Sequence, residues 1–502
     1  MKSIFERIDA LVKECGCVPE GYVLENALKP GEKPVQYMGE QEGLIGHALA
    51  RPPKGMLNNA VEMIKNNINI NARLAVHSFD DEELGFRVAD IRGLLLKNII
   101  DNIKDYDPHK LSTLAYSLAI FGTKLETVKL GLLLLVLFDF ADDEVVKKHI
   151  ITLGLYEEFT SYVISNIKGW PPQIRDHVYY IYAQKLSGWG KINAMECLEP
   201  VNDEVKDWVL RHGCRNDISF GYLGRTAYDK CDLENRLRDG GLDNEQMKGA
   251  SDIIHGLLID MPGKGISEVA NPALLTMLYL QELADHNLDI EDIANLYDLK
   301  RYLKGNTRSL EEDNNKAIQI IDRLLSLSDA EDMIKKSVED NPELAVPTAF
   351  EAGIDIADEL LEHVGNDFEG YYRYAYYFMR DGVYVDEFLN ICYKNLLERD
   401  FREGMGTEEP GPDSDKIWQI DVVLQQLGSY PGKGDKLVLT AVNSAILSFR
   451  KAAAQLIGTW EETKDVNIKK ISSEIFHAVK KVKKKEVDEE LKTAWDDVLN
   501  YK

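Results

Sequence analysis

The side chains with the widest chemical capacity in this sequence are its six cysteines and ten histidines. Metal sites need such residues at short, fixed spacings, for example two histidines on one helix face or two cysteines separated by two to four residues. No two histidines fall at the His-Glu-x-x-His spacing, and Cys15-Gly16-Cys17 separates its thiols by a single residue. The cysteines also lack the density of a disulfide framework. We therefore expect reduced thiols, no bound metal, no cofactor and no recognisable catalytic residue.

The densest group of candidate binding residues lies at 188–216. Trp189 offers a large flat face, and Lys191 and Arg215 supply positive charge. Such a trio suits an anionic or peptide ligand. The alternative interpretation is structural: the two glycines that flank Trp189 break helices, and the indole fills the layer between helices.

A second candidate surface is the aromatic run at 371–378. Such a run cannot face inward as a whole on a helix. Tyr374 and Tyr377 share a face with the two ends of the run and are expected in the core, whereas Tyr372 and Tyr376 lie partly elsewhere. Exposed tyrosines are enriched at interfaces because they give a large contact area at little entropic cost. Tyr372 and Tyr376 are therefore candidate partner contacts, with ordinary packing as the alternative.

The elements that would position these residues are α-helices. Apolar residues recur at helical period from end to end, at 82–104, 125–138, 143–152, 155–167, 173–187, 190–198, 202–212, 317–327, 350–364, 417–427, 436–457 and 468–483. Capping boxes, in which a Ser or Thr and a Glu three residues later satisfy each other's backbone N–H groups, occur at Ser3/Glu6, Thr123/Glu126, Ser328/Glu331 and Thr348/Glu351. The hairpin-like signal at 381–385 is too short to anchor a sheet. We expect helix in more than about 60% of residues and strand in less than about 5%.

Three of these segments resemble the inner helices of HEAT or armadillo repeats: 87–95, 192–200 and 449–457 combine small and aliphatic residues at helical spacing. The stretch Gly-Trp-Gly-Lys at 188–191, with 212–216 after it, also resembles an uncharacterised group of bacterial helical proteins, some of which are called limonene hydroxylase. The resemblance implies an all-α fold, an irregular α-solenoid of stacked antiparallel helix pairs. No haem, flavin or non-haem iron motif in the sequence supports a hydroxylase activity.

Two loops are candidate boundaries between regions. Residues 261–272 and 404–416 concentrate Gly, Pro and acidic residues, as exposed linkers do. They divide the chain into an N-terminal helical repeat region at 1–260, a central helical region at 261–403 and C-terminal helical repeats at 404–502.

The charge of the chain makes nucleic acid an unfavourable partner. Asp and Glu number 85 against 59 Lys and Arg, for a formal net charge of −26, and binding to a phosphate backbone needs clustered basic residues. The one dense basic run, at 480–485, is followed by acidic residues. Lys484/Asp488 and Lys485/Glu489 are spaced for ion pairs on one helix face, so we interpret the run as a solvated helix surface.

No segment is expected to cross a membrane. The most apolar run, 130–138, is far shorter than the roughly 20 residues that span a bilayer. The first residues carry scattered charges and lack the continuous apolar stretch of a signal peptide. We therefore expect a cytoplasmic protein.

The function that these patterns favour is a helical-repeat scaffold that binds a protein or peptide, because repeat stacks make extended surfaces and no catalytic motif is found. The alternative is an enzyme whose site is assembled across repeats from residues far apart in the sequence. Recognition of DNA lesions on a HEAT-like fold is a third and weaker possibility.

Overall fold

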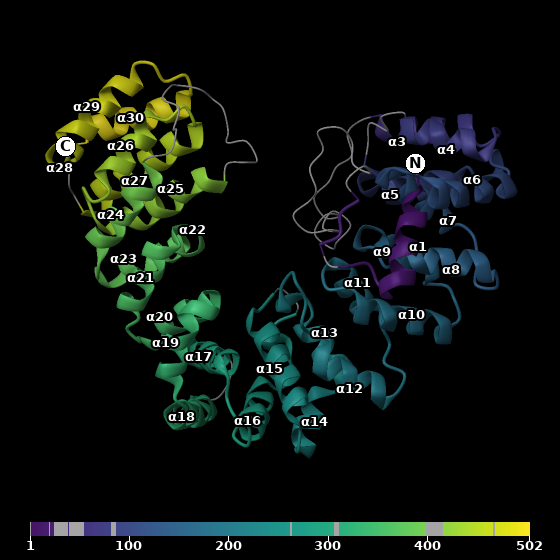
Figure 1. The fold of residues 1–502 in the computed structure, drawn as a ribbon, viewed down its shortest axis with the longest axis horizontal. Coiled ribbons are helices and arrows are strands. Elements are labelled where there is room, and N and C mark those ends of the chain that lie inside the picture. Colours follow the sequence, from purple (N-terminus) through teal and green to yellow (C-terminus); the bar gives the residue numbers. More distant parts are fainter. Residues whose placement is uncertain are drawn as a thin grey trace. The chain divides into compact units, whose positions relative to one another are not determined.

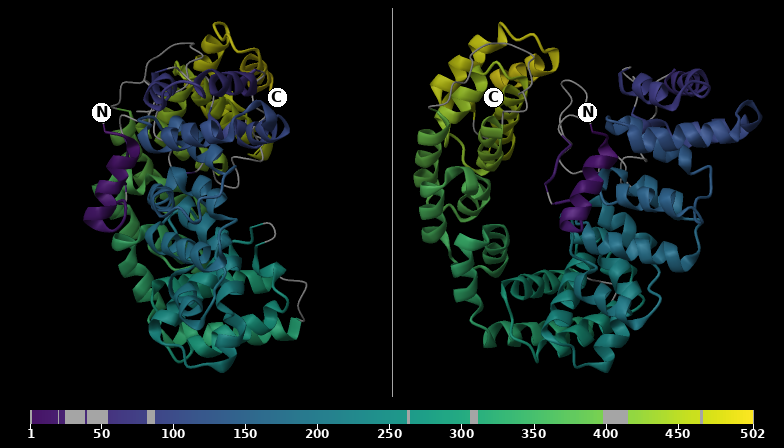
Figure 2. Two further views of the ribbon diagram at one scale, coloured as in Figure 1. Left: turned by 90° about the vertical axis from the view of Figure 1, so that its right-hand side faces the viewer. Right: turned by 45° about the vertical axis from the view of Figure 1, so that its right-hand side comes forward.

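The computed structural model describes most of the chain, namely residues 2–19, 21–24, 39, 55–81, 87–261, 264–305, 311–397, 415–464 and 467–501. Helices hold 77% of these residues, and none of them lies in a β-strand (Figures 1 and 2). The predicted all-α fold is thus confirmed, as is the expected share of helix. The hairpin-like signal at 381–385 marks the end of a helix instead of a strand turn, because Gly382 is the C-cap of that helix and has the left-handed conformation.

The chain divides into two compact units. Unit 1 comprises Met1–Asn287 with Arg301–Ile320, and unit 2 comprises Leu288–Lys300 with Ile321–Lys502. Helices α17 (Ile290–Gly305) and α18 (Glu311–Leu327) contribute residues to both units. The three regions that we predict from the loops at 261–272 and 404–416 stay a prediction. Residues 262–263 and 404–414 lie outside the described part of the chain.

Unit 1 is a succession of helices, and those from α5 to α12 are joined by short connections. Its α-helices are α1 (Ile4–Cys15), α3 (Met56–Asn67), α4 (Ala72–Asp81), α5 (Val88–Asp101), α6 (Pro108–Phe121), α7 (Leu125–Leu135), α8 (Glu144–Leu153), α9 (Glu157–Ile167), α10 (Pro172–Lys185), α11 (Trp189–Cys197), α12 (Asp203–His212), α13 (Gly224–Cys231), α14 (Leu233–Asp239), α15 (Asn244–Leu258) and α16 (Pro272–Leu283). Short 3₁₀ turns occur at η2 (Ile103–Asp105), η3 (Phe220–Tyr222) and η4 (Ile266–Glu268).

Neighbouring helices in unit 1 pack as pairs. The contacts are most extensive between α6 and α7 and between α10 and α11, and α12 packs on α15. Helix α7 is the most deeply buried, since every residue from Leu125 to Leu135 except Glu126 is buried. A helix that is apolar on all sides must lie inside the protein, so the run predicted at 125–138 is a core helix that ends slightly earlier than expected.

Unit 2 also consists of helices. They are α19 (Ala330–Asp340), α20 (Pro342–Ala352), α21 (Ala357–Asn366), α22 (Phe368–Tyr371), α23 (Ala375–Asp381), α24 (Val385–Leu396), α25 (Asp415–Gln426), α26 (Asp435–Asn443), α27 (Leu447–Lys464), α28 (Ile468–Ile471), α29 (Ser473–Lys483) and α30 (Glu489–Asn500), with 3₁₀ turns η5 (Tyr372–Tyr374) and η6 (Leu427–Ser429). One continuous apolar core runs through this unit and encloses Trp460 and Trp495. The indole N–H of Trp460 donates to the carbonyl of Leu427 at 2.8 Å, so this buried polar group has a partner.

The capping signals are only partly reliable. Ser3 and Glu6 form the predicted capping box at the start of α1. The other three predicted boxes are wrong. The hydroxyl of Thr123 bonds to Asp80, Ser328 precedes the N-cap of α19, and Thr348 lies inside α20, where its hydroxyl donates to a carbonyl four residues back. A Ser or Thr three residues before a Glu is common inside helices and beside them, which explains these errors.

Within the described residues, no helix combines the length and apolar character that crossing a bilayer requires. This agrees with the expectation drawn from the short apolar run.

Candidate functional site

The start of α11 is held by a carboxylate from α9. One oxygen of Glu157 accepts hydrogen bonds from the backbone N–H groups of Ser187 at 3.1 Å and Gly188 at 2.7 Å, and the other accepts from Gly190 at 3.2 Å. The first N–H groups of a helix have no partner within the helix and favour negative charge. Burial raises the pKa of Glu157, although these three bonds favour its ionised form. Glu157 thus occupies the start of α11, where these N–H groups would otherwise be open to an external anion.

The two glycines that flank Trp189 make room for this arrangement. A Cβ atom on Gly188 would lie 2.5 Å from the Glu157 carboxylate, and one on Gly190 would lie 2.6 Å from the side chain of Leu186. Neither position can take a larger residue without displacing a neighbour. The spacing of these glycines is therefore explained by packing.

Trp189 lies in the layer between helices. Its side chain is 3% exposed and meets the ring of Tyr222 edge to face, with centroids 4.9 Å apart. Its indole nitrogen has no hydrogen-bond partner within the described structure. In this conformation Trp189 offers almost no surface to a partner. This agrees with the alternative interpretation, in which the indole fills the layer between helices. A role in partner binding stays a prediction.

Lys191 is buried beside Trp208. It is 8% exposed, and its ammonium nitrogen donates to the carbonyl of His212 at 2.9 Å, at the end of α12. The same nitrogen lies 5.9 Å from the centre of the Trp208 ring. Burial lowers the pKa of Lys191 to about 8. The lysine thus joins α11 to α12 and is not a solvent-facing charge.

Arg215 is exposed, with 48% of its side chain accessible, and its role in partner binding stays a prediction. Its guanidinium forms a two-point ion pair with Asp252 of α15, at 3.1 and 2.9 Å, and lies 5.8 Å from the ring of Phe220. Asp252 also lies close enough to Lys191 to act on its pKa. The structure therefore brings Lys191 and Arg215 into one neighbourhood, where α11, α12 and α15 meet.

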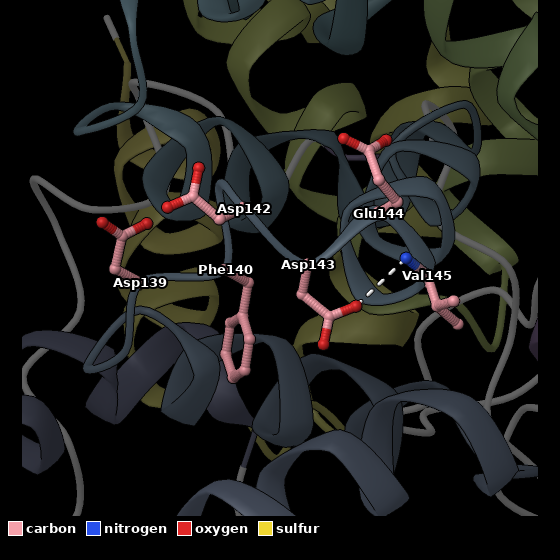
Figure 3. Close-up of a pocket in the computed structure, with 6 residues that line it drawn as sticks. All are labelled: Asp139, Phe140, Asp142, Asp143, Glu144 and Val145. Atoms are coloured by element: carbon pink, nitrogen blue, oxygen red, sulfur yellow. Dashed lines mark hydrogen bonds between the residues drawn. The ribbon is translucent and has the colours of Figure 1, made fainter.

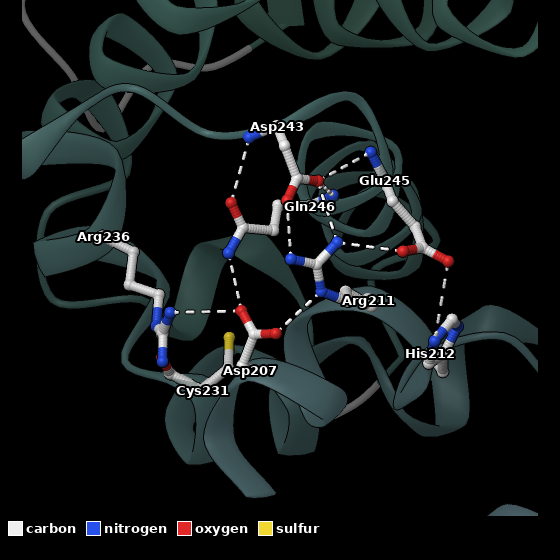
Figure 4. A network of polar contacts seen from close by, with 8 residues as sticks. All are labelled: Asp207, Arg211, His212, Cys231, Arg236, Asp243, Glu245 and Gln246. Carbon is white, nitrogen blue, oxygen red and sulfur yellow. Dashed lines mark hydrogen bonds and ion pairs between the residues drawn. The ribbon is translucent and has the colours of Figure 1, made fainter. Parts of the chain in front are cut away.

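Sequence reasoning missed the polar network next to this junction. In Figure 4 the guanidinium of Arg211 lies among three carboxylates: Asp207 at 2.7 Å, Asp243 at 2.6 Å and Glu245 at 2.9 Å. The hydrogen bonds from Arg211 lower the pKa of Asp243 to about 2. Asp207 also accepts from the side chain of Gln246 at 2.6 Å. The network ties α12 to the start of α15, and no short-range pattern could have indicated it, because Arg211 and Asp243 are 32 residues apart.

The two tyrosines predicted as contacts in unit 2 are half-buried. The ring of Tyr372 lies 5.9 Å from that of Phe368, and the ring of Tyr376 lies 5.6 Å from that of Phe350. Both pack against the core of the unit. Burial raises the pKa of Tyr376 to about 12. Their role in binding a partner stays a prediction.

The predicted division of the aromatic run is otherwise correct in outline. The residues expected in the core are buried, namely Tyr371, Tyr374, Tyr377 and Phe378. The run is not one helix, since it passes from α22 through the 3₁₀ turn η5 into α23. The hydroxyl of Tyr377 donates to the carbonyl of Ile354 at 2.9 Å and accepts from the N–H of Ile356 at 2.9 Å. This part of the run therefore serves to join α20, α21 and α23.

The connection between α7 and α8 forms an open concave surface, which we call the acidic hollow. It has a volume of about 600 Å³ and is lined by Asp139, Phe140, Asp142, Asp143, Glu144 and Val145. In Figure 3 Asp139 and Asp142 lie on one side, Glu144 and Val145 on the other, and Phe140 and Asp143 between them. All four carboxylates are exposed, and the neighbouring basic residue, Lys147, forms an ion pair with Glu144 at 2.6 Å.

Local hydrogen bonds give the acidic hollow its shape. The carboxylate of Asp143 caps α8 by accepting from the N–H groups of Val145 and Val146, each at 3.0 Å. Asp139 accepts from the N–H of Ala141 at 2.9 Å. The side chain of Val145 is left 60% exposed. Glu144 is exposed but forms an ion pair with Lys147 at 2.6 Å, and Asp142 lies beside it on the surface. The carboxylates and the exposed apolar group together form a surface suited to a cation with an apolar stem.

The acidic hollow is not arranged as a metal site. Among the described residues, no group of three or more His, Cys, Asp or Glu side chains is placed to hold a metal ion. The chemistry that the hollow offers is therefore that of separate negative charges on an open surface.

The lysine run near the C-terminus differs from the expectation. Helix α29 ends at Lys483 and α30 begins at Glu489, so Lys484/Asp488 and Lys485/Glu489 do not share a helix face. Asp488 instead caps α30 by accepting from the N–H of Leu491 at 2.8 Å. The predicted ion pairs are wrong because the helix ends before it reaches the acidic residues.

No protein-family model, no curated protein and no solved structure matches this chain.

Proposed function

We propose that this chain is a protein-binding scaffold, built as an irregular α-solenoid of antiparallel helix pairs related to HEAT and armadillo repeats, and that its acidic hollow binds a basic segment of a partner. The succession of contacting helix pairs in each unit supports the solenoid. Scaffolds of this kind bind through extended surfaces, and their function lies in the surface residues rather than in the fold.

The observation that carries the proposal is the composition of the acidic hollow. Four exposed carboxylates surround Phe140 and the exposed Val145, and they outnumber the one neighbouring cation, Lys147, which pairs with Glu144. Lys and Arg side chains have an aliphatic stem and a charged head, so they can place the stem on an apolar group while the head meets a carboxylate. A segment that carries several such side chains would find both kinds of contact here.

The charge of the whole chain would assist the encounter. A net charge of −26 attracts a basic partner at long range and increases the rate of association. The carboxylates of the hollow are exposed, and contacts between exposed charges are weakened by salt. Binding should therefore be strongest at low ionic strength and should weaken as salt is added.

The test measures the affinity of the full chain for a short fluorescent peptide of Lys, Arg and Leu, and for the same peptide with Glu in place of each basic residue. We expect the basic peptide alone to bind. Asp142→Asn combined with Glu144→Gln should weaken its binding about fivefold. These two residues are chosen because Asp139 and Asp143 hold the backbone.

The matched control separates the hollow from general attraction. Asp101→Asn combined with Glu312→Gln removes the same charge from exposed positions elsewhere in unit 1, where each residue pairs with a lysine four residues away in its helix, much as Glu144 pairs with Lys147. This control should bind the basic peptide within a factor of about two of the unchanged protein. Equal loss in both double variants, or equal binding of the acidic peptide, would contradict a site in the hollow.

A further inference from the structure

Two thiols stand at the end of α1 with a single glycine between them. Cys15 is the last residue of the helix and is exposed, Gly16 is its C-cap, and Cys17 follows and is half-buried. Both thiols are free. The pair lies away from the buried side of α1, which Ile4, Phe5 and Ile8 form near the other end.

The backbone at Gly16 brings the two cysteines together. Its φ of 75° and ψ of −1° are left-handed, and its N–H donates to the carbonyl of Val12 at 2.9 Å. A left-handed residue turns the chain back, so its two neighbours lie closer together than they would across an extended residue. A disulfide requires Cα atoms about 4.4–6.8 Å apart. A compact turn meets this requirement, whereas a fully extended chain exceeds it.

The side chain of Cys17 is already directed toward the backbone of Cys15. The sulfur of Cys17 lies 3.7 Å from the carbonyl oxygen of Cys15. The side chain of Cys15 is in solvent and can change rotamer without disturbing the core. Closure of the pair requires rotation of the side chains and adjustment of the turn.

The glycine is required by the conformation of the turn. A Cβ atom on Gly16 would meet no neighbouring atom within 4 Å, so packing does not exclude a side chain. The left-handed conformation does disfavour one, because residues with a Cβ atom rarely adopt it. Glycine at this position therefore preserves the geometry that the two thiols share.

The remaining cysteines provide the contrast. Cys214, Cys231 and Cys392 are buried, and Cys197 is exposed but has no second exposed cysteine beside it in the sequence. Burial protects a thiol from reagents in solution. Within the described residues, 15–17 is thus where two accessible thiols are held next to each other.

We propose that Cys15 and Cys17 form a reversible intramolecular disulfide by exchange with a small disulfide, such as oxidised glutathione. The thiolate of one cysteine attacks a sulfur of the small disulfide, forms a mixed disulfide and releases one reduced thiol. The second cysteine attacks the mixed disulfide, forms the Cys15–Cys17 bond and releases the second. The protein loses two electrons and two protons, and the small disulfide is reduced to two thiols.

The test treats the full chain with oxidised glutathione, blocks the remaining thiols with an alkylating reagent and weighs the N-terminal peptide. We expect a peptide lighter by two hydrogens that carries neither glutathione nor the alkyl group. Cys15→Ser and Cys17→Ser should each stop at the mixed disulfide, and Cys197 should never form an internal bond. Mixed disulfides at both positions of the unchanged protein, or a bond that joins two chains, would overturn the proposal.

A pair of glycine variants tests the role of the turn. Gly16→Ala should shift the equilibrium with glutathione toward the reduced thiols by roughly fivefold, because alanine resists the left-handed conformation. Gly21→Ala is the matched control, since Gly21 also has a positive φ, of 72°, and open space around it, but it does not separate the cysteines. An equal effect of the two substitutions would show that the Gly16 turn does not favour the bond.

Discussion

Arg450 and Glu486 form a two-point ion pair in which neither side chain has any exposed surface. The Nε and Nη2 atoms of the guanidinium lie 2.8 and 2.9 Å from the two oxygens of the carboxylate. Arg450 also donates to the carbonyls of Ser444 and Ala445. Burial would raise the pKa of Glu486, but the hydrogen bonds and charge of Arg450, together with the backbone N–H groups of Val487 and Asp488, lower it. The pair fixes the connection between α29 and α30 against α27.

The first prediction is that Arg450→Met destabilises the protein by about 3–5 kcal/mol, since it leaves a buried carboxylate without its partner. Arg450→Met combined with Glu486→Leu should lose less, because no charge then remains buried. The free energy of unfolding in urea measures both. A single variant that costs under about 1 kcal/mol would mean that water reaches Glu486.

The second prediction concerns Glu461, which is 2% exposed and accepts one bond from the N–H of Ile468 at 3.3 Å. Burial raises its pKa from 4.5 to about 7. Between these two values the folded protein holds a proton that the unfolded chain has lost, so stability falls as the pH rises through this window and stays lower above it.

Glu461→Gln removes this titration while it keeps an oxygen for Ile468. The variant should exceed the unchanged protein in stability by on the order of 2 kcal/mol above about pH 8 and differ little near about pH 5. Urea unfolding across this range measures the effect. The exposed neighbour offers a matched control, since Glu462→Gln should leave the pH dependence unaltered. Parallel curves for Glu461→Gln and the unchanged protein would refute the assignment.

The third prediction is that Glu157→Ala costs about 3 kcal/mol or more, because it leaves the N–H groups of Ser187, Gly188 and Gly190 without their acceptor. Glu157→Gln should cost less, since its oxygen can still accept from two of the three. Hydrogen exchange should speed up at 187–190 in the alanine variant before the rest of unit 1 is affected. Unchanged exchange there would show that another group can replace the carboxylate.

The fourth prediction separates packing from binding at the aromatic residues. Trp189→Ala should cost about 3–5 kcal/mol, as expected when a buried large side chain is removed. Tyr372→Ala and Tyr376→Ala should each cost only about 1–2 kcal/mol, because these rings are half-buried. Thermal unfolding measures all three. A Trp189→Ala variant as stable as the unchanged protein would restore the interpretation of Trp189 as a surface contact.

The sequence alone determined the helical class of this protein. Apolar residues at helical spacing and the absence of strand signals act within one or two turns, so they can be read without knowledge of the fold. The apolar character of residues 125–135 likewise required burial, and Tyr371, Tyr374, Tyr377 and Phe378 are buried as predicted, although the run is not one helix. These predictions hold because each depends on neighbours along the chain.

Only the tertiary structure decided which polar groups meet. Glu157 caps α11 from 31 residues away, and Arg450 reaches Glu486 across 36. With 85 acidic residues in the chain, composition cannot select these two carboxylates. Glu486 also explains why the ion pairs predicted for Lys484 and Lys485 do not form. It lies in the connection between α29 and α30, where its carboxylate pairs with the buried Arg450, and α29 has already ended at Lys483. Side-chain spacing is a property of a single helix, whereas a buried ion pair depends on how several helices pack.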